Sequence, residues 1–186
     1  MNPQIAIIGL NQVGASIGLA LGAYKENITR IAHDADGALM RKLEKEGVYD
    51  KSHARLTDAV RDADLVILSL PTDLLRDALG LMAGHIRPDS VVVCVSVVAR
   101  VVYDWAREIL PQKQPFIVLQ PVLHPARLRD WDDNTASPHG DLFENTHMLV
   151  VTDADTQEKA FQMATDLCAL LKAKPYFSEP LEADGI

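Results

Sequence analysis

An apolar run that leads through a glycine turn into a row of small residues constrains this chain more than any other feature. The stretch from Gln4 to Gly18 reads QIAIIGLNQVGASIG. Its first five residues have the composition of a buried strand, and the small residues that follow favour a helix packed closely on a sheet. Gly9 is placed for the tight turn, and Gly14 for the close approach of the helix. A strand, a glycine turn and a helix in this order are typical of a dinucleotide-binding unit.

The glycine turn departs from the usual pattern at one position. Asn11 stands where a second glycine is common, so the fingerprint reads G-x-N-x-x-G. Asparagine tolerates a left-handed backbone better than most residues, and its side-chain amide can bond a phosphate. The free N–H groups at the start of the helix complete the expected site for a pyrophosphate. We therefore expect a dinucleotide to contact Gly9, Asn11, Gln12, Val13 and Gly14.

A carboxylate at the end of the second strand-like run selects the cofactor. That run ends at Asp34, where a carboxylate is expected to accept hydrogen bonds from an adenosine ribose. Asp36 adds a second negative charge, and the basic residues nearby in sequence are Arg30 and Arg41. A 2′-phosphate would be repelled here, so the sequence predicts NAD rather than NADP. The alternative is that Asp34 or Asp36 only caps the helix that follows.

Apolar strand-like runs alternate with segments of helical period along the chain. This alternation is the signature of a parallel sheet covered by helices on both faces. The expected fold class is therefore α/β, with a doubly wound, mostly parallel sheet of the Rossmann type. We expect strands over residues 4–8, 28–33, 65–70, 90–95, 116–119, 148–152 and 175–177, and helices over 14–24, 37–46, 56–62, 73–84, 101–110 and 155–172.

Composition argues against several classes of function. The net charge is −8 and neither Lys nor Arg forms a cluster, which disfavours nucleic acid or an anionic membrane surface as a partner. No apolar stretch approaches the length of a membrane span and no basic leader opens the chain, so we expect a cytoplasmic protein. Cys94 and Cys168 lack disulfide or metal spacing, and the histidines are scattered, so we expect buried thiols and no metal site.

The segment from Pro121 to Gly140 is polar, contains three prolines and has no sustained period. A long irregular loop after a sheet strand is commonly functional, because open α/β sheets bind ligands beyond the carboxyl ends of their strands. His124 lies between two prolines and is the candidate catalytic residue, since imidazole suits proton transfer at neutral pH. The alternative is a loop histidine held by a backbone carbonyl. Arg127 is a candidate for binding a substrate carboxylate, the alternative being pairing with neighbouring aspartates.

Two other loops follow strands of the expected sheet. The backbone at Leu70 and Pro71 is expected to face the nicotinamide-side ribose, with Thr72 equally well explained as a helix N-cap. Ser96 follows the next strand in the same way. Its alternative role is that of a structural hydroxyl.

With these pieces in place, the chain resembles the prephenate and arogenate dehydrogenases of tyrosine biosynthesis. IAIIGLNQVGASIGLAL is similar to the opening glycine-rich unit of that family, and His124-Pro125 to its H-P motif. DLFENTHMLVV resembles the segment before the last strand of its cofactor domain, and EPLEADGI its junction with a helical domain. The resemblance implies an NAD(P)-dependent oxidation of prephenate or arogenate with loss of CO₂, in which His124 accepts the proton of the ring hydroxyl.

The same resemblance implies how the protein is divided. It predicts a dinucleotide-binding domain over residues 1–178 and the start of a linker to a helical second domain, absent from this chain, over 179–186. It also implies a homodimer for the complete protein.

Besides Asn11, the chain departs from the family pattern in two places. The family usually has an Asp, a small residue, a Ser and a Lys after the strand at 90–95, where this chain has Cys94, Ser96, Val97 and Ala99. The H-P motif is usually followed by Met-Ala-Gly, and here by Ala126-Arg127-Leu128. Two alternatives therefore stay open: a non-catalytic NAD(H)-binding or regulatory module, and a related reductase acting on another small acid.

Overall fold

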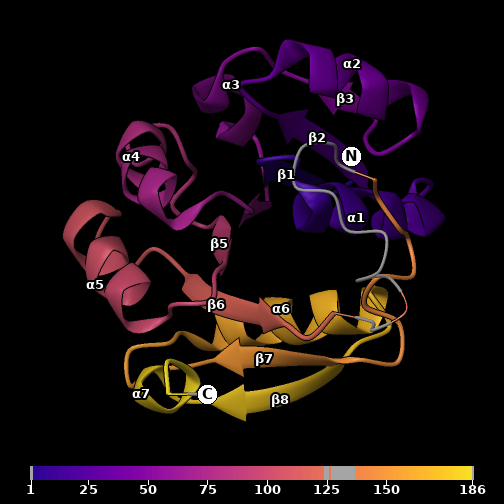
Figure 1. Cartoon of the computed structure of the whole chain (residues 1–186). Coiled ribbons are helices and arrows are strands. Elements are labelled where there is room, and N and C mark those ends of the chain that lie inside the picture. The colour runs from indigo at the N-terminus through magenta and orange to yellow at the C-terminus, as the bar shows by residue number, and fades with distance from the viewer. Residues whose placement is uncertain (1, 124–125, 127–136, 186) are drawn as a thin grey trace.

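Eight strands form one sheet in the order β3-β2-β1-β4-β5-β6-β7-β8 in the computed structural model, which describes residues 2–123, 126 and 137–185 (Figure 1). Neighbouring strands are parallel from β3 to β6, antiparallel between β6 and β7, and parallel between β7 and β8. The strands are β1 (Gln4–Ile8), β2 (Thr29–His33), β3 (Lys51–Ser52), β4 (Leu65–Leu68), β5 (Val91–Val95), β6 (Phe116–Pro121), β7 (His147–Val151) and β8 (Lys174–Ser178).

Helices cover both faces of the sheet, so two hydrophobic cores form. Residues of β1 alternate between them, with Ile5 and Ile7 in one core and Ala6 and Ile8 in the other. Residues from α1, α2 and α6 fill the first core, and residues from α3, α4, α5 and α7 fill the second. The helices are α1 (Gln12–Leu21), a 3-10 turn η1 (Gly22–Tyr24), α2 (Gly37–Lys45), α3 (Leu56–Val60), α4 (Thr72–Met82), α5 (Arg100–Ile109), α6 (Glu158–Leu170) and α7 (Pro180–Ala183).

The doubly wound, mostly parallel fold predicted from the sequence is confirmed. Two short elements were not predicted. The strand β3 has only two residues, both exposed, and it is held by backbone pairing to β2 rather than by an apolar pattern. The helix α7 has four residues and buries only Ala183. The predicted bounds of the other elements differ from the structure by a few residues, because strand and helix ends carry little pattern.

The strand order reverses between β1 and β4, and this is where the candidate site lies. The N–H of Gly9, directly after β1, donates to His33 O at 2.9 Å, and Ser69 N, directly after β4, donates to Ile8 O at 2.8 Å. These bonds continue the sheet past the ends of its strands. In open α/β sheets the crevice beyond the carboxyl ends of the strands at such a reversal receives the ligand.

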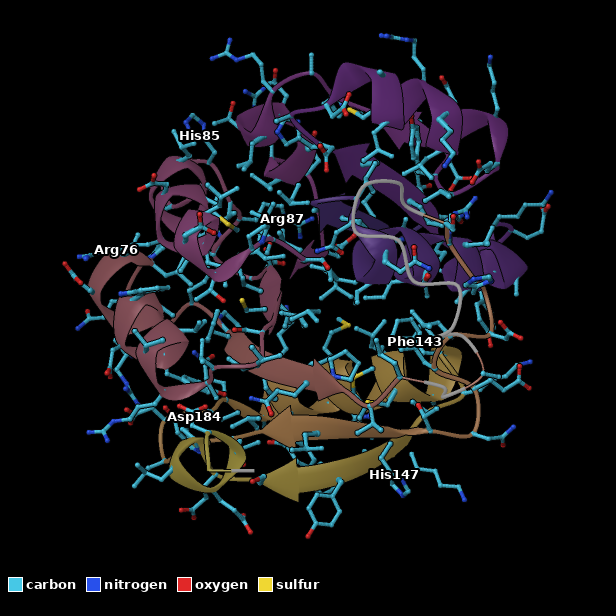
Figure 2. All side chains as sticks on the ribbon, viewed as in Figure 1. Arg76, His85, Arg87, Phe143, His147 and Asp184 are labelled. Atoms are coloured by element: carbon cyan, nitrogen blue, oxygen red, sulfur yellow. The ribbon has the colours of Figure 1, made fainter. Side chains whose placement is uncertain are left out.

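The segment after β8 folds back onto the domain. Asp184, labelled in Figure 2, accepts hydrogen bonds from Ala99 N at 2.5 Å and from Arg100 N at 3.0 Å. These N–H groups lie at the start of α5, where a helix has no internal acceptors. A carboxylate from the far end of the chain therefore caps α5.

Candidate functional site

The two glycines of the turn are required because a Cβ at either position would clash with the backbone. Gly9 has a φ of +89°, and a Cβ added there would lie 2.2 Å from Ser69 O. A Cβ added at Gly14 would lie 2.1 Å from Gly9 O, inside any permitted contact distance. The end of β4, the turn and the first turn of α1 are thus packed backbone against backbone. This is the close approach that a dinucleotide turn needs.

Asn11 adopts a different conformation from the one expected. Its φ of −61° and ψ of 178° are extended, so its tolerance of a left-handed backbone is not used. The side chain instead caps α1: Oδ1 accepts from Gly14 N at 3.0 Å and from Ser69 Oγ at 2.9 Å, and Nδ2 donates to Ser69 O at 3.0 Å. Asn11 therefore ties the turn to the end of β4.

The N–H groups of Gln12 and Val13 remain for an anion. They lie in the first turn of α1, where no carbonyl of the helix can accept them. The N–H of Gly14 is already bonded to Asn11. The start of α1 therefore offers two backbone donors to a pyrophosphate, rather than three.

Asp34 and Asp36 have separate roles. Asp36 caps α2 by accepting from Ala38 N and Leu39 N, and these two bonds lower the pKa of its carboxyl. Asp34 is half-buried, and its two oxygens accept from Leu10 N at 2.7 Å and from Asp36 N at 2.8 Å. A carboxylate accepts up to about four hydrogen bonds. Asp34 is therefore oriented by the backbone and retains capacity for ribose hydroxyls.

Arg30 is engaged inside the protein. Its side chain is 4% exposed and its guanidinium donates to both oxygens of Asp50, at 2.7 and 3.1 Å. It also donates to three backbone carbonyls, those of Gly18, Gly47 and Val48. Arg30 is therefore buried and turned toward these acceptors, not toward a 2′-phosphate, which agrees with the predicted preference for NAD.

The loops after β4 and β5 have different supports. Pro71 is the N-cap residue of α4 and Thr72 its first helical residue, so the alternative interpretation of Thr72 as the cap is wrong. Leu70 packs against the Gly9 turn, since its Cδ2 would lie 2.7 Å from a Cβ at Gly9. The hydroxyl of Ser96 donates to Val98 O at 3.0 Å and accepts from Val98 N at 3.2 Å, as a structural hydroxyl would.

Ser69 begins the loop whose backbone was expected to face the cofactor, but the sequence reasoning did not predict the role of its side chain. It is 2% exposed and supplies both a carbonyl and a hydroxyl to Asn11. A signal for it was present, because a polar residue directly after the apolar run of β4 has no place in a core unless it is bonded.

The predicted catalytic and substrate-binding residues, His124 and Arg127, lie outside the described residues. The described residues run to Leu123, two residues after the end of β6, and continue without a gap from Ser137. Both assignments therefore stay predictions.

The cysteines are buried as predicted, and burial raises the pKa of each thiol, that of Cys168 to about 11. Among the residues that the structure describes, no three His, Cys, Asp or Glu side chains are grouped to hold a metal ion. Within the same residues, no helix has the length and apolar character needed to cross a membrane.

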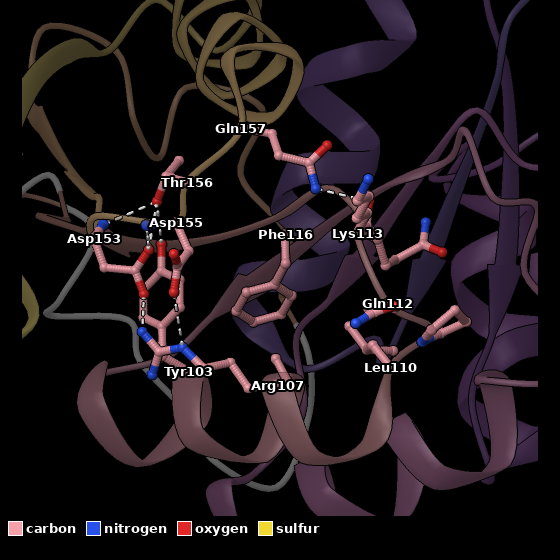
Figure 3. Close-up of a pocket in the computed structure, with 13 residues that line it drawn as sticks. Tyr103, Arg107, Leu110, Gln112, Lys113, Phe116, Asp153, Asp155, Thr156 and Gln157 are labelled. Carbon is pink, nitrogen blue, oxygen red and sulfur yellow. Dashed lines mark hydrogen bonds and ion pairs between the residues drawn. The ribbon is translucent and has the colours of Figure 1, made fainter.

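A cavity of about 690 Å³ lies away from the glycine turn (Figure 3). It is lined by α5, by the residues just before β6, and by Asp153 and Asp155–Gln157 after β7. Its position at the amino end of β6 places it at the edge of the sheet opposite the carboxyl ends of β1 and β4. Arg107 crosses it to Asp153 and Asp155, and burial raises the pKa of Tyr103 to about 12. The cavity is separate from the candidate cofactor site.

Known proteins resemble this chain over most of its length. Residues 17–177 match the family described as prephenate dehydrogenase, nucleotide-binding domain. A cyclohexadienyl dehydrogenase of Zymomonas mobilis is 25% identical over 165 residues, which are 88% of this chain and 54% of the relative. The chain thus spans about half the length of that relative.

Solved structures agree with this result. The prephenate dehydrogenase of Aquifex aeolicus, in complex with hydroxyphenyl propionate and NAD⁺, superposes with a TM-score of 0.84 at 15% identity, covering 97% of this chain and 61% of that one. The arogenate dehydrogenase of Synechocystis gives 0.79 at 19% identity, covering 95% and 60%. At such identity these structures show the fold, and the family match shows the relationship. This chain belongs to the prephenate dehydrogenase nucleotide-binding domain family.

Proposed function

We propose that this chain is the NAD-binding domain of a dehydrogenase that oxidises prephenate or arogenate with loss of CO₂. The observation that carries the proposal is the turn at the strand-order reversal. Gly9 and Gly14 leave no room for a Cβ, α1 presents free N–H groups, and Asp34 is held where β2 ends. The family match and the named activities of the relatives support the oxidation.

The residues present fit a dinucleotide. The N–H groups of Gln12 and Val13 would hold the pyrophosphate, Asp34 would accept the adenosine ribose hydroxyls, and the backbone at Leu70 and Pro71 would face the other ribose. When bound, the nicotinamide supplies the hydride acceptor. The repulsion of a 2′-phosphate by Asp34 and the engagement of Arg30 favour NAD over NADP.

His124 is proposed as the group that bonds the ring hydroxyl of the substrate and takes its proton as hydride leaves the same ring carbon. Loss of the ring carboxylate as CO₂ leaves its bonding electron pair in the ring, which becomes aromatic. Arg127 is proposed to bind a substrate carboxylate through its planar donors. The resemblance at the H-P motif supports the role of His124, and the planar donor group of Arg127, three residues further on, supports the second assignment.

Calorimetric titration of the chain with NAD⁺ and NADP⁺ tests the cofactor site. We expect NAD⁺ to bind more tightly, and Asp34→Asn to weaken NAD⁺ binding and reduce this preference, because a neutral amide is a poorer acceptor for two hydroxyls. Asp36→Asn is the matched control, since it makes the same change of charge two residues away and Asn is an equally good helix cap. Equal losses in the two variants would contradict the role of Asp34.

Replacing His124 in the complete protein tests the proposed chemistry. We expect His124→Asn to lower turnover of prephenate or arogenate by roughly 10²- to 10⁴-fold and to leave NAD⁺ affinity unchanged. Turnover equal to that of the unaltered protein would eliminate His124 as the base.

A non-catalytic NAD-binding module is the second candidate function. The observation in its favour is the loop after β5, where polar groups are already used inside the protein. Ser96 is bonded to Val98, and Asp184 takes the N–H groups of Ala99 and Arg100. NAD⁺ binding without turnover of any cyclohexadienyl substrate by the same natural protein would support this function over the first.

We also propose how the complete protein is organised. We place the dinucleotide-binding domain at residues 1–178 and the start of a helical second domain at 179–186, in a cytoplasmic homodimer. The resemblance at EPLEADGI supports this division. Light scattering on the complete protein tests the dimer, and a monomer at high concentration would contradict it.

A further inference from the structure

One face of α1 is covered by the segment 137–140, in register with the helix. Ser137 N donates to Gln12 Oε1 at 2.7 Å, and Gln12 Nε2 donates to Ser137 O. One turn further along α1, Ser16 Oγ accepts from His139 N at 3.0 Å. Positions four apart lie on the same side of a helix. The segment therefore runs along α1 from its first turn.

The covering segment is fixed at its other end as well. Gly140 lies beside Leu19, since a Cβ added to it would be 3.6 Å from Leu19 Cγ. Leu142 and Phe143, the latter labelled in Figure 2, follow at once and are fully buried in the first core. The downstream end is thus held by packing, while the upstream end is held by Gln12.

The Gln12 side chain is buried, and both ends of its amide are bonded. Its exposed fraction is 5%, and the donor and the acceptor of its amide both bond the backbone of Ser137. We call this pair the Gln12 clasp. A buried amide with both groups bonded has one strongly favoured orientation, because either group left unpaired would be costly.

The clasp acts on the part of α1 that the cofactor needs. The backbone N–H of Gln12 is one of the two donors left for a pyrophosphate, and the first turn of a helix frays readily because its N–H groups lack internal partners. Fixing a binding group before the ligand arrives raises affinity, since less order is lost on binding.

We propose that Gln12 is a positioning residue for the dinucleotide: through its clasp on Ser137 it holds the first turn of α1 in the geometry that receives the pyrophosphate. The inference rests on the proposed function, because it concerns the same cofactor site. Coupling of this kind is reciprocal, so a bound dinucleotide also strengthens the clasp and protects the amide of Ser137.

Gln12→Met tests the proposal on the full chain. Methionine keeps the length and burial of the side chain and removes both hydrogen bonds. We expect faster amide exchange at Ser137 and His139, and NAD⁺ affinity weakened about tenfold in calorimetry. In the unaltered chain, NAD⁺ should slow exchange at Ser137. Gln162→Met, an exposed amide on α6, is the matched control and should change none of these.

Three results would overturn the inference. Unchanged exchange at Ser137 in Gln12→Met would show that the clasp does not form in solution. Faster exchange with unchanged NAD⁺ affinity would make the clasp a purely structural contact. If the unaltered chain binds neither NAD⁺ nor NADP⁺, the proposed function fails and the coupling fails with it, and exchange at Ser137 still reports whether the clasp forms.

Discussion

At the scale of single residues, the site depends on side chains that make hydrogen bonds to the backbone. Asn11, Asp34 and Gln12 each make hydrogen bonds to the backbone of another chain segment. Such bonds cost little to form in place and orient the donors that remain for a cofactor. The departure at Asn11 thus does not open the turn. It closes the turn against β4.

Asp50 gives a prediction with a definite sign in pH. Hydrogen bonds from Arg30 hold the pKa of the Asp50 carboxyl below its usual value, against the opposing effect of burial. As pH falls, the Asp50 carboxyl therefore takes up its proton first in the unfolded chain, at a pH of about 3.9. The stabilisation by Asp50 is complete above that pH and is lost as pH falls through the folded pKa.

Asp50→Asn should accordingly destabilise the chain at pH 7 and by less at pH 3. Urea denaturation of both proteins at the two pH values measures the difference. A gap of equal size at both values would show that the Arg30–Asp50 pair does not carry the effect.

At the scale of elements, α1 was largely predictable and its contacts were not. The small residues after Gly14 indicate close packing, and the helix is there. What the sequence did not indicate is the neighbour at each position. A Cβ at Gly18 would lie 2.6 Å from Val48 O, in the turn that follows α2. That partner is 30 residues away in sequence and follows from the three-dimensional packing alone.

Two glycine substitutions should therefore have opposite effects. Gly18→Ala should lower the free energy of unfolding by about 1–3 kcal/mol, because overpacking outweighs the better helix propensity of alanine. Gly80→Ala on α4 should raise it by about 0.5–1 kcal/mol, since nothing lies within 4 Å of the added Cβ. Urea midpoints of the two variants measure both effects, and shifts of the same sign would contradict this packing of α1.

At the scale of the whole molecule, the alternation of apolar runs predicted the doubly wound sheet, because strands buried on both faces are continuously apolar. The direction of β7 was not predictable, since an apolar run reads the same in either direction. Neither was the cap of α5 by Asp184, which joins residues 85 apart. The features that could not be predicted are thus mostly contacts between segments that are far apart in the sequence.

Because Asp184 and Ala99 are 85 residues apart in sequence, the cap of α5 affects how the domain unfolds. The hydrogen bond that Ala99 N donates to Asp184 closes a loop that contains β6, β7 and β8, so the segment after β8 cannot detach without freeing the first turn of α5. The domain should then lose these parts in one cooperative step. In native-state exchange, the amides of Ala99 and Arg100 should follow the same dependence on denaturant as the paired amides of β8. Earlier release of Ala99 would instead show that the segment after β8 opens by itself.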